Sequence, residues 1–220
     1  AEMLANDCDR LSRLHRLLGP RETPHTPNGR IPYYLDANAR YEHRDTLLAL
    51  LDHADHIGAR DRIILLEEPF LEDDEQDVRD LDVCIAADES AHTDADAGRR
   101  IDLGYGAIAL KPIAKTLSMT LRIARLAHDR GIPCFCADLT VNPWLLAWNK
   151  AVACRLAPFP GLGLPLIETN GHQNYRDWEA MRRRLPHPDA PWNGIRNGCF
   201  ELGPEYYAMD GGLLTQEQAE

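Results

Sequence analysis

Charged side chains follow a series of short apolar runs in this chain. Glu67 and Glu68 come directly after the apolar run 63–66 and before a proline, in the stretch ILLEEPF. Other apolar runs end in the same way, at Asp36, at Asp88 with Glu89, at Lys111, at Asp138 and at Glu168. Solvation explains one charged group at a strand end, but packing gives no reason for such regular recurrence. If the runs are neighbouring parallel strands, their charged ends meet at one edge and form one site.

Three of the carboxylates could hold a metal ion together. Asp36, Glu67 and Asp88 follow three successive apolar runs and would provide hard oxygen ligands. Mg²⁺ prefers such ligands and retains some of its waters, and Mn²⁺ accepts the same set. Side chains alternate along a strand, so Glu68 would point away from the metal and orient another group. The sequence therefore predicts a Mg²⁺ site with three carboxylate ligands.

A lysine ends the next apolar run. Lys111 follows residues 108–110 and would lie beside the predicted metal. A lysine that is partly removed from water can lose its proton near neutral pH. Lys111 is therefore the candidate general base or acid. Lys115, four residues later, falls at the start of a predicted helix, and we expect it to be solvated.

Apolar periodicity places these residues on alternating strands and helices. Strands are expected at 31–36, 63–66, 83–87, 107–110, 133–137 and 162–167. Helices are expected at 3–18, 44–57, 73–81, 116–128, 143–156 and 173–184, with a loop between the third and fourth strands. This order predicts a parallel sheet covered by helices, either an open doubly wound sheet or a (β/α) barrel. No glycine-rich phosphate loop follows a predicted strand, which argues against an open doubly wound sheet that binds nucleotides.

Composition excludes several classes of partner. The net charge is −11, whereas a nucleic-acid partner requires a basic face. No run of 18 apolar residues occurs, so no membrane-spanning helix is expected. The first residues predict an amphipathic helix rather than a signal peptide. We therefore expect a cytoplasmic protein that binds neither nucleic acid nor membrane.

Four motifs resemble one enzyme family. The stretches LDAN, LLEEPF, AADES and ALKP, in this order and about one βα unit apart, are similar to the enolase superfamily. They resemble more closely its mandelate racemase/muconate lactonizing enzyme branch, over about residues 33–170. The resemblance implies a modified TIM barrel in which a base removes the proton α to a carboxylate and Mg²⁺ stabilises the enediolate. It also implies a small carboxylate substrate and a homo-oligomer.

The resemblance assigns roles residue by residue. By this match Asp36, Glu67 and Asp88 are the metal ligands, and Lys111 is similar to the acid/base lysine of the muconate lactonizing subgroup. Asn38 and Glu89 match supporting residues at the site.

The chain departs from the family pattern in two places. The N-terminal capping domain and the first two barrel strands, including a Lys-x-Lys motif, have no counterpart in this chain, so six of eight βα units are expected. We expect residues 1–184 to form the C-terminal part of the barrel and residues 185–220 to pack on the capping domain, with the missing part in cis or on another chain. The residues that carry specificity in relatives also differ here. The polar groups that could contact the distal part of the substrate are Asp138, Glu168, Asn170 and His172.

Two functions remain open from the sequence. The first is a Mg²⁺-dependent racemase or epimerase, or a dehydratase of sugar acids, since these reactions share proton abstraction as their first step. The second is a non-catalytic or regulatory remnant that keeps the metal site and lacks the opposite base.

Overall fold

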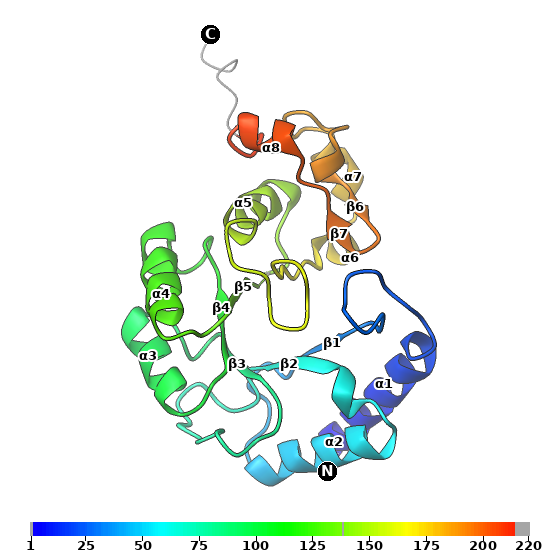
Figure 1. Cartoon of the computed structure of the whole chain (residues 1–220), viewed down its shortest axis with the longest axis vertical. Coiled ribbons are helices and arrows are strands. Elements are labelled where there is room, and N and C mark those ends of the chain that lie inside the picture. Colours follow the sequence, from blue (N-terminus) through cyan, green and yellow to red (C-terminus); the bar gives the residue numbers. More distant parts are fainter. Residues whose placement is uncertain (1, 138, 214–220) are drawn as a thin grey trace.

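A curved parallel sheet forms the centre of the protein. The computed structural model describes residues 2–137 and 139–213, and its main sheet has the strand order β1-β2-β3-β4-β5 (Figure 1). The strands are β1 (Tyr33–Asp36), β2 (Ile63–Glu67), β3 (Ile85–Ala87), β4 (Ala107–Leu110) and β5 (Cys134–Cys136), each parallel to its neighbours. The five strands and the helices that connect them confirm the predicted barrel-like fold.

The inner face of the sheet shows how strongly it curves. In a flat five-stranded sheet the two edge strands lie roughly 19 Å apart. Here Tyr34 of β1 and Phe135 of β5 meet edge to face, with ring centroids 5.6 Å apart. The sheet therefore curls far enough to bring the side chains of its first and last strands together.

Helices cover the outer face. They are α1 (Glu2–Leu18), α2 (Arg44–His56), α3 (Asp94–Asp102), α4 (Leu117–Asp129) and α5 (Pro143–Ala153), with a short 3₁₀ turn, η1 (Arg60–Arg62), before β2. Figure 1 shows α1 to α4 outside the arc of strands. The larger apolar cluster fills this outer layer and includes Leu47 and Leu51 of α2 together with Leu66 and Ile108 of the sheet. No helix among the described residues is long and apolar enough to cross a membrane.

Strand alternation separates the outer cluster from an inner one. The inner cluster contains Leu65, Ala86, Ala107, Ala109, Phe135, Ala137 and Phe159. Tyr34, Leu65, Ala86 and Ala109 each stand two residues before Asp36, Glu67, Asp88 and Lys111 respectively. Because side chains two residues apart share one face of a strand, the four charged groups continue the inner face at its carboxyl edge.

The connection from β2 to β4 differs from the prediction. Residues 73–81 are not helical; the guanidinium of buried Arg100 binds the carbonyls of Glu72 and Asp74 instead. The expected loop before β4 contains α3, which begins with a capping box between Thr93 and Asp96. Apolar periodicity did not reveal α3 because its buried face consists of Ala97, Gly98 and Arg100.

The last strand and helix are shorter than predicted. The expected strand 162–167 is reduced to one parallel bridge between Cys136 and Ile167, because Pro165 has no N–H to donate to a ladder. The expected helix 173–184 is split into α6 (Gly171–Asn174) and α7 (Trp178–Arg182). At the break, the Asn174 amide donates to the carbonyl of Asn170 and so competes with the helical backbone.

The C-terminal residues form a small unit near α5. It contains the 3₁₀ turn η2 (Pro191–Asn193), the hairpin β6 (Ile195–Arg196) and β7 (Cys199–Phe200), and α8 (Pro204–Ala208). Lys150 of α5 anchors this unit: its ammonium donates to the carbonyl of Trp192 and lies 4.9 Å from the ring centroid of Phe200. Packing of this segment on a capping domain stays a prediction.

Candidate active site

The first strand end presents Asp36. Asn38 donates to both oxygens of this carboxylate, from its backbone N–H at 2.8 Å and from its side-chain amide at 2.6 Å. Asn38 and Ala39 have φ values of 50° and 54°, so the chain turns back here and brings Asn38 onto Asp36. Surrounding protein raises the pKa of Asp36, whereas the hydrogen bonds from Asn38 lower it. Asn38 therefore favours the charged carboxylate, as a supporting residue should.

The second strand end buries Glu67. Its side chain is 2% exposed, and the hydroxyl of Tyr34 donates to it. Removal from water raises the pKa of Glu67, and the nearby carboxylates of Asp88 and Glu168 raise it further. Glu67 and Asp88 are also in hydrogen-bond contact. Burial and these two carboxylates therefore favour the protonated form of Glu67, whereas a bound cation would favour its carboxylate.

Glu68 serves the opposite side of the strand, as alternation predicted. Its Oε2 accepts from the backbone N–H of Asp88 at 2.6 Å and from the N–H and hydroxyl of Ser90 at 3.2 and 2.9 Å. Burial raises the pKa of Glu68, and these hydrogen bonds counteract that effect. The φ of Glu68 is 36°, in the left-handed region, which aims the side chain at the next loop. Glu68 thus fixes the loop that follows β3 and carries Asp88.

Lys111 lies at the end of β4 and is buried. Its ammonium pairs with Oδ2 of Asp88 and lies 3.5 Å from Oε1 of Glu89, whose side chain is half exposed. Burial lowers the pKa of Lys111, but the neighbouring carboxylates Asp88, Glu89 and Glu67 outweigh it and raise the pKa overall. Lys111 is therefore protonated in this arrangement and placed to act as a proton donor.

Lys115 was expected to be solvated, and this is wrong. Its side chain is only 6% exposed, and its Nζ lies 3.3 Å from Oδ1 of Asp88. The residues after β4 make a tight turn, in which Lys115 N–H donates to the carbonyl of Lys111 at 2.8 Å. This turn bends the chain back and brings Lys115 under the strand ends instead of into solvent.

The remaining predicted residues lie at different distances from this centre. Glu168 is close enough to Glu67 to affect its charge, and the amide of Asn170 lies 3.5 Å from Oε1 of Glu168. His172 is exposed, and its ring packs near Trp178, with centroids 6.3 Å apart. Among the described residues, His172 contacts Gln173 and Trp178 rather than the central carboxylates. Asp138 lies outside the described residues.

The donor groups suit Mg²⁺ chemically but do not close around one point. Carboxylate oxygens are hard ligands of the kind that Mg²⁺ prefers. In the conformation described for residues 2–137 and 139–213, no three His, Cys, Asp or Glu side chains lie close enough to hold one ion. Asp36 binds Asn38, and Asp88 binds the two lysines. The metal ligands and the roles of the other site residues therefore stay predictions.

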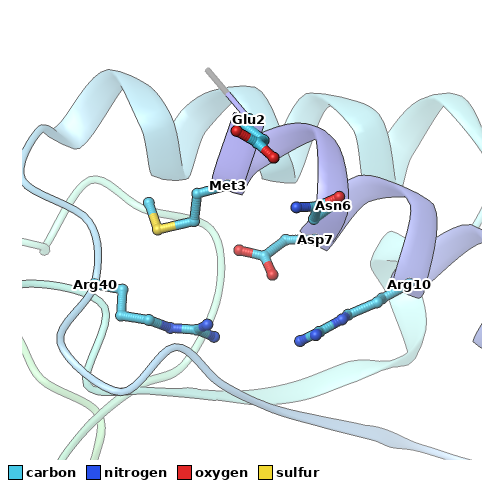
Figure 2. A pocket seen from close by; sticks show the side chains of 6 residues that line it. All are labelled: Glu2, Met3, Asn6, Asp7, Arg10 and Arg40. Atoms are coloured by element: carbon cyan, nitrogen blue, oxygen red, sulfur yellow. The ribbon is translucent and has the colours of Figure 1, made fainter.

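Two cavities meet beside Asp36. The inner cavity, of 190 Å³, is lined partly by Tyr34 and Asp36. The outer one, of 490 Å³, lies against the first turns of α1 and shares Asp7, Arg10 and Arg40 with the inner cavity. In Figure 2 the guanidinium ends of Arg10 and Arg40 face one another across the outer cavity. The cavities thus extend from the first strand end toward α1.

Sequence reasoning did not single out Tyr34 and Ser90, and it misjudged Lys115. The sequence does indicate a place for Tyr34 at the site, because Tyr34 precedes Asp36 by two residues and so lies on the same face of the strand. Ser90 could be found only from the contact of Glu68 with the following loop.

Comparison with known proteins agrees with this geometry. Residues 2–179 match the family model described as enolase C-terminal domain-like. An o-succinylbenzoate synthase of Edwardsiella ictaluri (strain 93-146) is 32% identical over 141 residues, which cover 61% of this chain and 43% of that protein. The chain therefore spans less than half the length of this relative.

Solved structures share the fold. A mandelate racemase/muconate lactonizing protein from Herpetosiphon aurantiacus matches with a TM-score of 0.61 at 19% identity, covering 76% of this chain and 44% of that one. A dipeptide epimerase from Cytophaga hutchinsonii, complexed with Mg and the dipeptide D-Ala-L-Val, matches with a TM-score of 0.54 at 19% identity, covering 66% and 38%. Because the family match extends over most of the chain, the chain belongs to the enolase C-terminal domain-like family, in the mandelate racemase/muconate lactonizing branch of the enolase superfamily.

Proposed function

We propose that the protein containing this chain is a Mg²⁺-dependent enzyme that abstracts the proton α to the carboxylate of a small organic acid. One observation carries the proposal. Three carboxylates and a lysine, Asp36, Glu67, Asp88 and Lys111, end four adjacent parallel strands on the same inner face. This arrangement combines groups that can hold a cation with a group that can move a proton.

Each residue has a distinct part in the proposed reaction. Mg²⁺ held by Asp36, Glu67 and Asp88 would stabilise the negative charge that develops on the substrate carboxylate. Tyr34 orients Glu67 through its hydroxyl, and Asn38 keeps Asp36 charged. The Nζ of Lys111 donates a proton to the substrate or, once deprotonated, accepts the α-proton.

The finer reaction is either racemisation or epimerisation, or loss of water from a hydroxylated acid. The dipeptide epimerase and the o-succinylbenzoate synthase among the relatives support this range. The polar Glu168 and Asn170 beside Glu67 favour a hydroxylated substrate, because they offer hydrogen-bond partners at the mouth of the site.

A specific observation supports a second candidate, a non-catalytic remnant. The ammonium groups of Lys111 and Lys115 both contact Asp88 and supply positive charge where a metal would. Such a remnant would still bind Mg²⁺ at the three carboxylates, but Lys111 would stay in its ion pair and would move no proton.

Calorimetric titration with Mg²⁺ tests the metal site that both candidates share, and exchange of a substrate α-proton separates them. We expect the parent protein to bind Mg²⁺ and Glu67→Gln to lose most of the affinity, because the neutral amide removes one anionic ligand. Glu75→Gln is the matched control, since Glu75 is 64% exposed at the surface. Exchange of the α-proton of candidate acids with D₂O, followed by proton NMR, then identifies substrates. A parent that binds Mg²⁺ but exchanges no α-proton would support the remnant, and a parent without Mg²⁺ affinity would overturn both candidates.

A further inference from the structure

Lys115 makes three hydrogen bonds in the interior of the protein. Its Nζ lies 2.8 Å from the carbonyl oxygen of Asp88, 3.3 Å from Oδ1 of Asp88 and 3.3 Å from the carbonyl oxygen of Ala109. Asp88 follows β3, Ala109 belongs to β4, and Lys115 itself precedes α4. One side chain therefore connects three successive elements at the edge of the sheet where the candidate site lies.

The number of acceptors favours the charged form of Lys115, against burial, which lowers the pKa of its ammonium. An ammonium has three N–H donors, whereas a neutral amine has two. Three oxygens surround Nζ, so only the protonated form satisfies all of them. A charged donor on a buried carboxylate also makes a stronger bond than a neutral donor.

The two oxygens of Asp88 have different partners. Oδ1 faces Lys115, whereas Oδ2 faces Lys111 on the inner side of the sheet. Lys115 also donates to the backbone carbonyl of Asp88, and rotation of the Asp88 side chain would break the contact of Oδ1 with Lys115 and that of Oδ2 with Lys111. Glu68 restrains the same residue from the other side, through the N–H of Asp88.

We propose that Lys115 is the positioning residue for Asp88. It occupies Oδ1 and thereby leaves Oδ2 as the oxygen that Asp88 presents to the centre of the site. Of the two carboxylate oxygens of Asp88, Lys111 contacts only Oδ2. A cation that binds Oδ2 can therefore displace Lys111 from Asp88 while Lys115 stays on Oδ1. The consequence for Mg²⁺ rests on the proposed function: Asp88 would bind the ion through one oxygen, held at a fixed angle.

Lysine NMR tests the contact without any metal. The chain has only three lysines, Lys111, Lys115 and Lys150, so their ¹⁵N-labelled side chains give few signals, which single Lys→Arg variants assign. We expect the NH₃⁺ signal of Lys115 to be protected from exchange and to shift in Asp88→Asn. The signal of Lys150, which contacts the C-terminal unit instead, should not move. An unchanged Lys115 signal in Asp88→Asn would overturn the inference.

Mg²⁺ titration tests the consequence. Residues that orient metal ligands typically change metal affinity by about 10- to 100-fold, and we expect a loss of that size in Lys115→Met. Lys115→Arg keeps the positive charge and should recover most of the Mg²⁺ affinity. If Lys115 had a purely structural role, the affinity of the variants would not depend on whether the charge is kept. Circular dichroism melting checks that both variants fold. A folded Lys115→Met variant with the parental Mg²⁺ affinity would contradict the inference. A parent that does not bind Mg²⁺ would contradict the proposed function instead. In that case the NMR experiment alone tests whether Lys115 holds Asp88.

Discussion

Lys150 provides a quantitative prediction about stability and pH. Its side chain is 3% exposed and contacts a backbone carbonyl, an amide oxygen and an aromatic ring. Burial lowers the pKa of Lys150 from 10.5 to about 8. The variant Lys150→Met removes this titration and keeps a flexible side chain of similar length.

The sign follows from proton binding in the two states. Below pH 8, Lys150 is protonated in both the folded and the unfolded protein, so it contributes no pH dependence. Between pH 8 and pH 10.5 the unfolded chain binds more protons, so the contribution of Lys150 to the free energy of unfolding rises with pH. Each pKa unit corresponds to about 1.36 kcal/mol, so the contribution of Lys150 to the free energy of unfolding near pH 10.5 exceeds that below pH 8 by about 3 kcal/mol.

The experiment must isolate this contribution, because cysteines act in the opposite direction. Burial raises the pKa of Cys84 to about 11 and those of Cys134 and Cys136 to about 12, so these thiols lower stability as pH rises above 9. Urea unfolding of the parent and Lys150→Met at several pH values gives the difference at each pH, in which the cysteine contributions cancel.

We expect the free energy of unfolding of the parent, relative to that of Lys150→Met, to rise by about 3 kcal/mol between pH 8 and pH 10.5. Arg155→Met is the control, because Arg155 is exposed and its replacement removes a nearby positive charge without changing a lysine. A parent-to-variant difference that stays constant with pH would refute the reasoning, since it would mean that Lys150 keeps an ordinary pKa in the folded protein.

Three further predictions concern the site and its support. Lys111→Ala should keep the fold and lose turnover by about 10²–10⁴-fold, and D₂O exchange of the substrate α-proton at the parental rate would show that Lys111 moves no proton. Tyr34→Phe removes the donor to Glu67, so we expect Mg²⁺ affinity to change in calorimetry while the melting temperature changes little; unchanged affinity would mean that Tyr34 does not orient this ligand. Phe135→Ala should lower the free energy of unfolding by about 3–5 kcal/mol in urea titration, because it empties the contact between β1 and β5; a loss below about 1 kcal/mol would mean that the inner face repacks freely.

The sequence by itself determined the strand ends and which charged residues meet there. The apolar runs before Asp36, Glu67 and Lys111 are local features, and buried parallel strands require them. The alternation of side chains then places these charged groups on one face and directs Glu68 to the other. A local pattern with period two therefore predicts most of the candidate site.

Only the tertiary structure decided which partners the charged groups have. Lys115 is buried because a turn after β4 returns it to Asp88, and α3 forms although its buried face has little apolar side chain. Residues 73–81 remain irregular: four of the nine are aspartates, which favour turns over helix interiors, and Arg100, from a later segment, binds the carbonyl groups of Glu72 and Asp74. Burial of a charged side chain depends on acceptors that are distant in sequence, and apolar periodicity contains no information about them.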